Sequence, residues 1–202
     1  RDETGVFPFF AYHLFYKFIA NANMILENTD AATGPEGDKK MIKGQAYAYR
    51  ALSYFWLTQL YGERYDPHSG NNSPAVSLVL SSTAGKQPRS SVAAVYSQII
   101  KDLDNAVDLL ESPDNTFIRP SKCHFTAAIV KGLRARVALA MHDWETAKTY
   151  ASEAIRESGC SLMTAEQYRQ GFNTADNPEW LWAFEQTAEQ STYYHGFMAV
   201  MS

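Results

Sequence analysis

The sequence predicts an all-α protein of paired helices, joined by loops of very different length, with a short extended segment near 180–184. First, apolar residues in the segment 42–66 cover most of the circumference of a helix, so other helices must pack on more than one side of it. Second, four further segments repeat apolar residues every three or four positions, the period of a helix. Third, the period of two that indicates a strand is clear only near 180–184.

Length and composition are those of one folded domain, 1–202. Of the 202 residues, 46% are hydrophobic and 20% are charged, which is enough for a substantial core. A net charge of −4 without a Lys/Arg cluster argues against nucleic acid, because phosphate contacts need concentrated positive charge. No apolar run is long enough to span a membrane. Near Arg1 there is neither a signal peptide nor a lipid-carrying cysteine, and we expect a mature form or an excerpt of a longer protein.

The first two predicted helices form an antiparallel hairpin. Apolar residues repeat from Phe7 to Leu26, with Pro8 in the first turn, where its missing N–H costs nothing. The connection 29–38 is polar and rich in Gly and Pro, and Asp38 or a residue close to it is expected to cap the central helix. Gly62 is expected to end that helix in the left-handed conformation, which glycine adopts without steric cost.

A long connection and a third helix follow. The segment 63–89 has no helical period, and such a connection is usually functional or flexible. Ser90 or Ser91 is expected to cap a helix from Val92 to Leu110 that has one clean apolar face. The charged residues of this helix, Asp102 among them, are placed mostly off that face.

Two further long helices are predicted. Ser121 is expected to cap the helix Phe125–Met141, in which Gly132 allows close helix approach, and Asp143 is expected to cap the next helix, which ends at Gly159. One aromatic and several small residues of this last helix have the spacing of the second helix of a tetratricopeptide repeat: Trp144, Ala147, Ala151, Ala154 and Ile155.

Two short elements complete the prediction. Thr164 and Gln167 form a capping box for a short helix that ends near Gly171. After it, the alternation of Trp180, Trp182 and Phe184 places them on one face of an extended segment.

Five groups of residues occur in a fixed order: Asn23; Gly44-Gln45-Ala46 with Tyr49-Arg50-Ala51, Tyr54-Phe55 and Leu60-Tyr61-Gly62; Val95-Tyr96 with Ile99, Asp102-Leu103 and Ala106; Lys122 with Ala127-Ala128, Leu133 and Ala135-Arg136-Val137; and Asn177 with Glu179 and Trp182. Together they resemble the SusD/RagB family, outer-membrane nutrient-binding lipoproteins of Bacteroidetes. The resemblance covers roughly residues 11–185. Gln45 stands where the family usually has an acid.

The resemblance implies a helical scaffold that contains tetratricopeptide-like pairs. It also implies that the protein binds a nutrient oligosaccharide or polysaccharide at the cell surface and delivers it to a TonB-dependent, SusC-like transporter. Localisation at the outer membrane would then depend on an N-terminal lipid anchor that this chain does not contain. No cofactor, metal ion or catalysed reaction is implied.

Ligand-binding candidates come from the segments without a regular period. Sugar rings present apolar C–H faces, so exposed aromatic side chains beside polar ones suit carbohydrate binding. Aromatic residues on helical faces are assigned to the core instead, among them Phe55, Trp56, Trp144 and the Phe7–Phe18 set. The candidates are Arg64, Tyr65, Asp66, Asn71, Asn72, Tyr193 and Tyr194.

Polar residues inside the apolar helices are expected to have structural partners. Arg50 and Arg136 are predicted to be partly buried and held by polar groups, because an unpaired buried charge is prohibitive. Since Gln45 replaces the acid, the partner of Arg50 must come from elsewhere or be a neutral amide. Asn23 is expected to bond to a neighbouring helix or loop, since a mid-helix asparagine is otherwise unfavourable.

Two other classes of function make different demands on the sequence. A tetratricopeptide adaptor would bind a peptide in its groove and would show uninterrupted repeats of about 34 residues. A glycan-processing enzyme would need two converging carboxyl groups, whereas Asp102 and Asp104 diverge on their helix. The sequence has no nucleotide-binding, hydrolase or zinc-site motif, and its five histidines are scattered. Cys123 and Cys160 are expected to be free, half-buried thiols.

Overall fold

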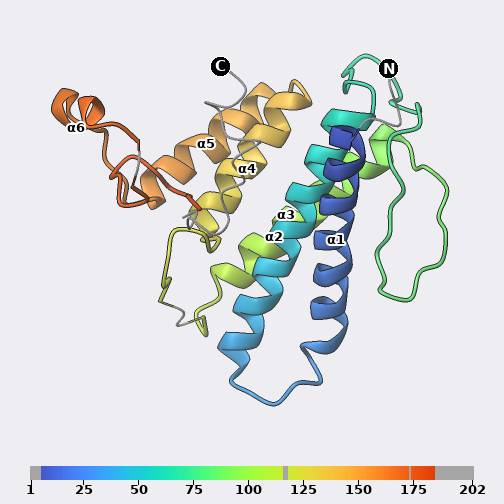
Figure 1. Ribbon diagram of the computed structural model, residues 1–202, viewed down its shortest axis with the longest axis horizontal. Helices are drawn as coiled ribbons and strands as arrows, with labels where there is room; N and C mark the ends of the chain where they lie inside the picture. The colour runs from blue at the N-terminus through green and yellow to red at the C-terminus, as the bar shows by residue number, and fades with distance from the viewer. Residues whose placement is uncertain (1–5, 116–117, 173, 185–202) are drawn as a thin grey trace.

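The computed structural model describes residues 6–115, 118–172 and 174–184, with side chains from residue 9 onward (Figure 1). Within them the predicted all-α fold is confirmed. None of the helices in these ranges is long and apolar enough to cross a membrane. The helices are α1 Val6–Asn28, α2 Glu36–Tyr61, α3 Val92–Leu110, α4 Ala127–Ala140, α5 Trp144–Glu157 and α6 Ala165–Arg169.

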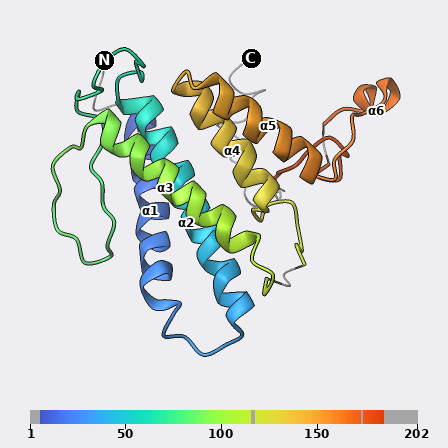
Figure 2. The same ribbon diagram turned by 180° about the vertical axis from the view of Figure 1, so that it is seen from behind.

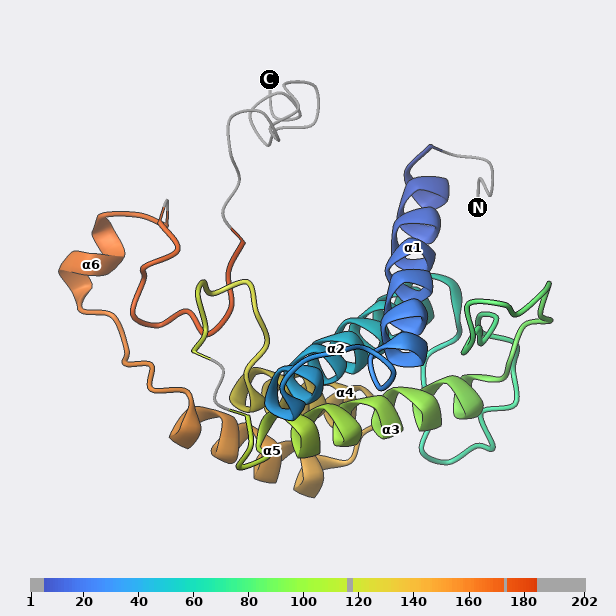
Figure 3. The ribbon, with the colours of Figure 1, turned by 90° about the horizontal axis from the view of Figure 1, so that it is seen from below.

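The central helix α2 is covered on more than one side, as its apolar circumference predicts. It packs against α1, α3 and, at fewer positions, α4, and Figure 3 shows α1 and α3 on opposite sides of it. Helices α4 and α5 form a second pair (Figure 2). The short helix α6 lies at one end of the long axis, and the loop between α2 and α3 lies at the other (Figure 1).

The core lies between α1, α2, α3 and α4. Burying large apolar side chains supplies most of the free energy that holds such helices together. The largest fully buried side chains are Tyr54, Tyr96, Phe125, Ile19, Leu57, Ile99 and Leu103. Phe55 is buried as predicted, Phe15 is half-buried against the core, and the side chain of Phe7 lies outside the described residues. Five other aromatic residues assigned to the core are exposed instead. Their exposed fractions are 66% for Phe9, 64% for Phe10, 40% for Phe18, 39% for Trp56 and 60% for Trp144.

Close helix approach depends on Gly44. A Cβ atom there would lie 2.8 Å from Leu110 Cγ, so any larger residue would force the Leu110 side chain to shift where α2 passes α3. At Gly132 a Cβ atom would lie 3.8 Å from that of Ala154, an ordinary contact. The prediction that Gly132 is needed for close helix approach is therefore wrong, because α4 and α5 leave room for a methyl group.

Both predicted ends of α2 need correction. The residue before the helix is Pro35, which has no side-chain bond to the first turn, and Asp38 lies inside that turn with Glu36. Two carboxylates at this position still favour the helix, because its N-terminus carries partial positive charge. Gly62 is extended, with φ −95°, not left-handed. A Cβ atom there would lie 2.8 Å from Thr58 O, so the close backbone contact explains the glycine.

The caps of the later helices are mostly as predicted. Ser91 caps α3, Asp143 caps α5, and Thr164 forms the capping box of α6 with Gln167. The exception is α4, which begins at Ala127 and is capped by Thr126 rather than Ser121.

A buried ion pair joins α2 to α3. Arg50 donates through Nε and Nη2 to the two carboxylate oxygens of Asp102, at 2.8 and 2.7 Å, and through Nη1 to Asn23 Oδ1 at 2.8 Å. Arg50 is 6% exposed and Asp102 is fully buried, so the prediction that Asp102 lies off the apolar face is wrong. Burial opposes the charge of Arg50, but the hydrogen bonds and charge of Asp102 outweigh it and raise the pKa of the guanidinium.

The second predicted buried arginine is exposed. Arg136 on α4 is exposed and lies over the ring of Trp56 on α2, 5.9 Å from its centroid. The buried cation of α4 is Lys131, whose Nζ reaches carboxylates of Glu111 and Glu157 at 2.5 and 2.7 Å. Burial opposes its charge, but these carboxylates raise the pKa of Lys131. The pairing fastens α4 to the end of α3 and to α5.

Residues 180–184 do not form a regular strand. The segment bends, and it is attached to the chain before α4 by Ala183 N–H donating to Lys122 O at 3.2 Å. Trp182 donates through Nε1 to Cys123 O at 2.9 Å, and its ring packs on Phe125 with centroids 4.9 Å apart. Trp182 thus docks onto the core, whereas Trp180 stacks on Phe172 and Phe184 is 59% exposed, so the alternation does not reflect pairing in a sheet.

Candidate functional site

The loop between α2 and α3, residues 62–91, is irregular but firmly attached to the helices. Tyr16 on α1 donates to Ser77 O at 2.7 Å, and Asn23 Nδ2 donates to Val79 O at 2.8 Å. The hydroxyl of Tyr54 both donates to Val79 O at 2.9 Å and accepts from Val79 N at 2.8 Å. Burial raises the pKa of Tyr54 to about 12. The predicted structural bond of Asn23 is therefore confirmed, and it holds the loop.

The parts of the loop on either side of Ser77 and Val79 are held as well. Arg89 donates to the carbonyl oxygens of Ala75 at 2.7 Å, Pro74 at 3.0 Å and Tyr61 at 3.1 Å. Farther along, Glu27 on α1 accepts from the N–H and the hydroxyl of Ser82. These hydrogen bonds lower the pKa of Glu27. Much of the long loop is thus an ordered surface layer over the helices.

The turn 66–71 contains two of the predicted ligand residues, and they bind each other. Asp66 N donates to Asn71 Oδ1 at 2.9 Å, and Asn71 Nδ2 donates to Asp66 O at 2.8 Å. Asn71 is buried and has a positive φ of 49°, which asparagine tolerates better than most residues. Its amide thus shapes the turn, while Asp66 is exposed beside it.

The other candidates from this loop differ in exposure. Tyr65 is half-buried and packs edge to face on Tyr96, with ring centroids 5.0 Å apart, so it is not the freely exposed ring that the sequence suggests. Arg64 and Asn72 are exposed on either side of the turn 66–71. Their side chains present donors and acceptors to solvent. Tyr193 and Tyr194 lie outside the described residues.

A groove between α4 and α5 is a surface that the sequence did not indicate. Its volume is about 510 Å³, and its walls are mostly apolar. Trp144 and Ile155 are 60% and 74% exposed there. Trp144 was assigned to the core, but helical spacing shows which residues share a face and not whether that face is covered. The lining residues are Gly132, Ala135, Arg136, Leu139, Trp144, Ala147, Lys148, Ala151, Ala154 and Ile155.

The described residues contain little reactive chemistry. No group of three His, Cys, Asp or Glu side chains among them could hold a metal ion. Cys123 and Cys160 are free and half-buried, as predicted. Asp102 is engaged by Arg50, and Asp104 pairs with Arg134 on the surface at 3.3 Å. These two carboxylates therefore do not converge on a cleft.

Comparison with known proteins assigns the architecture to a family. Residues 4–139 match the family model SusD-like_3, described as starch-binding and associating with the outer membrane. A SusD-like protein of Bacteroides ovatus is 26% identical over 87% of this chain, which spans 32% of that relative's length.

Two solved structures extend the comparison. A SusD-like carbohydrate binding protein from Bacteroides vulgatus superposes with a TM-score of 0.80 at 35% identity, over 90% of this chain and 38% of that one. A structure described with xylogluco-oligosaccharide superposes with a TM-score of 0.69 at 25% identity, over 91% of this chain and 36% of that one. With a family match that covers most of its length and with the same helical scaffold, this chain belongs to the SusD-like family.

Proposed function

We propose that this chain is the helical part of a cell-surface protein that binds a nutrient glycan and delivers it to a TonB-dependent, SusC-like transporter in the outer membrane. Membership of a family described as starch-binding carries the proposal. A similar structure described with xylogluco-oligosaccharide supports a glycan as the ligand. Because this chain spans 38% or less of these three relatives, the remainder of such a protein would share the ligand site and hold the lipid anchor.

The ordered loop offers one face for such a ligand. Arg64 and Asn72 are exposed beside a turn that the Asp66–Asn71 pair keeps in shape. Side chains held in place before binding lose less conformational entropy when a ligand arrives, which favours affinity. The proposed activity is binding alone, with no bond broken in the ligand.

Calorimetric titration tests the proposal. Xylogluco-oligosaccharide, maltohexaose and cellohexaose are titrated into the 202-residue chain and into Arg64→Ala/Asn72→Ala. Lys86→Ala/Gln87→Ala is the matched control, because it removes one cation and one amide that are exposed elsewhere in the same loop. We expect binding to weaken in the first variant only, with circular dichroism unchanged in both. Equal binding by all three proteins would remove the loop residues from the site.

The adaptor alternative retains one supporting observation, the apolar groove between α4 and α5. An adaptor of this kind binds a helix or peptide in such a groove. Against it, the irregular loop 62–91 interrupts the repeat between α2 and α3. Leu139→Glu, placed in the groove wall, should leave glycan binding unchanged if the main proposal holds.

A further inference from the structure

An exposed group of three aromatic rings lies at the α6 end of the molecule. Tyr168 on α6 meets Phe172 edge to face, with ring centroids 5.2 Å apart, and Phe172 stacks on Trp180 at 6.1 Å with planes 8° apart. Tyr168 is 62% exposed and Phe172 46% exposed, while Trp180 is half-buried. We call these three residues the α6 platform. Contiguous exposed apolar side chains of this kind commonly mark a binding surface.

The platform is supported by a structured turn. Asn177, which is buried, accepts from Trp180 N at its carbonyl oxygen, at 3.2 Å, and from Glu179 N at its side-chain oxygen, at 3.0 Å. Glu179 in turn accepts from Met163 N at 3.3 Å. These bonds tie the turn to the chain before α6, so Trp180 is held in position without help from a ligand. A ring fixed in this way loses little freedom on binding.

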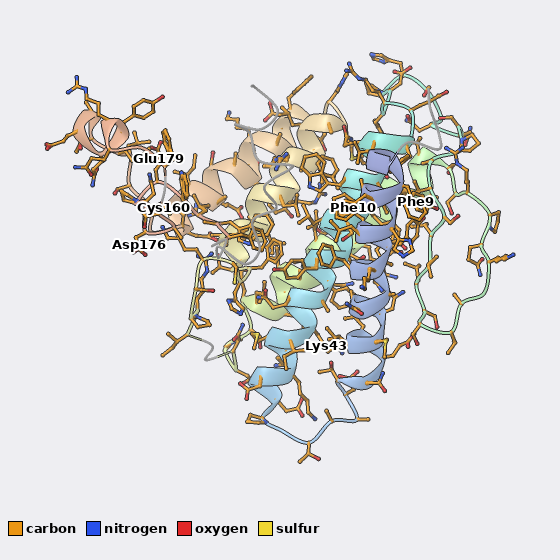
Figure 4. All side chains as sticks on the ribbon, viewed as in Figure 1. Phe9, Phe10, Lys43, Cys160, Asp176 and Glu179 are labelled. Atoms are coloured by element: carbon orange, nitrogen blue, oxygen red, sulfur yellow. The ribbon has the colours of Figure 1, made fainter. Side chains whose placement is uncertain are left out.

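In the segment that carries the rings, acidic residues outnumber basic ones. Glu166 on α6 and Asp176 are exposed, Glu179 is half-buried, and Arg169 is the one basic residue between 164 and 180. Figure 4 shows Glu179 near α6 and Asp176 farther from it. Carboxylates accept hydrogen bonds from hydroxyl groups and repel anions. In contrast, the groove between α4 and α5 is lined mainly by aliphatic side chains.

We propose that the α6 platform is a binding subsite for a neutral oligosaccharide. Aromatic faces match the apolar C–H faces of sugar rings. The excess of carboxylates over the single basic residue in this segment suits sugar hydroxyls and disfavours uronic acids. This inference rests on the proposed function for the class of ligand, but it places the ligand at a site separate from the loop 62–91. The platform lies at the opposite end of the long axis from the loop 62–91 (Figure 1).

The test uses the 202-residue chain and calorimetric titration with four probes: xylogluco-oligosaccharide, maltohexaose, cellohexaose and an oligogalacturonate. The variant Phe172→Ala/Trp180→Ala removes the stacked rings, and Tyr168→Ala removes the exposed one. Two controls are matched to them. Tyr168→Phe keeps the ring, and Leu162→Ala removes an apolar side chain that is 84% exposed at the same end. Circular dichroism and thermal unfolding show whether each variant remains folded.

We expect a neutral probe to bind, at least tenfold weaker binding in the double variant, weaker binding in Tyr168→Ala, and unchanged binding in both controls. Unchanged neutral binding in the folded Tyr168→Ala and double variants would overturn the platform and leave the proposed function standing. Binding of the oligogalacturonate alone would also overturn the platform but not glycan binding. Binding of none of the four probes would count against both proposals.

Discussion

Replacing Asp102 by Asn should strongly destabilise the protein, although the two side chains have nearly the same shape. Asp102 is fully buried and accepts from Arg50 twice and from Gln98 Nε2 at 2.8 Å. The amide cannot neutralise the guanidinium, and its NH₂ group faces other donors. Leaving one member of a buried pair without its counterion costs about 3–5 kcal/mol. Removing Arg50 alone, as in Arg50→Met, should cost a similar amount.

The double variant Arg50→Met/Asp102→Leu separates the charge effect from a packing effect. With both charges replaced by apolar groups of similar size, the main remaining cost is the unpaired side-chain oxygen of Asn23. One unpaired buried acceptor costs about 1–3 kcal/mol. The double variant should therefore be less destabilised than either single variant, and far less than their sum.

Urea unfolding followed by circular dichroism measures these differences. With a denaturant dependence of about 2 kcal/mol per molar urea, the midpoint should fall by about 1.5–2.5 M in Asp102→Asn. A fall that corresponds to less than about 1 kcal/mol would show that the charge of Arg50 is effectively hydrated, which would refute the reasoning. Additive costs in the double variant would refute it as well.

Three further predictions concern single contacts. Gly44→Ala should lower the free energy of unfolding by about 1 kcal/mol, since the clash with Leu110 on α3 outweighs the gain in helix propensity. Gly85→Ala is the control and should not be destabilised, because a Cβ atom there would have no other atom within 4 Å. Gln45→Leu should cost about 1–3 kcal/mol by unpairing the N–H and carbonyl of Phe125, which Gln45 binds at 2.8 and 2.7 Å. Gln45→Glu, which keeps only the acceptor, should fall between Gln45→Leu and the wild type in urea unfolding. Because the pKa of Glu27 is lower in the folded protein than its ordinary value of 4.5, the bonds of Glu27 to the loop stabilise the protein fully at a pH above 4.5. This stabilisation is lost as the pH falls through the folded-state pKa. The stability advantage of the wild type over Glu27→Gln should therefore be constant near neutral pH and shrink in acid; an advantage that grows on acidification would contradict this.

The sequence predicts the helices and most of their caps because these depend on nearby residues. Ser91, Asp143 and Thr164 each bind a backbone N–H within three residues, and that spacing is visible in the chain. Thr126 was missed because Ser121 has the same chemistry a few positions earlier. Which residue begins the helix depends on where the connection docks on the core, and sequence spacing does not carry that information.

Burial was predicted less well because it depends on how helices face one another. Asp102 looks solvent-exposed on its own helix, and only the position of Arg50, on α2, explains its burial. Lys131 is buried where it pairs with Glu111, just after α3, and with Glu157 on α5. Trp144 lines the groove between α4 and α5 and stays 60% exposed, although His142 stacks on its ring. Among the ligand candidates, Asn71 and Tyr65 have partners within the fold that a single-sequence argument does not place.

The contacts that hold the loop between α2 and α3 have a consequence for evolution. Tyr16, Asn23 and Tyr54, all on helices, bind carbonyl oxygens of the loop, not its side chains. Every residue type supplies the same carbonyl, so substitutions at many loop positions would leave its path unaltered. Relatives could thus exchange the outward-facing residues of the loop while inheriting one backbone course.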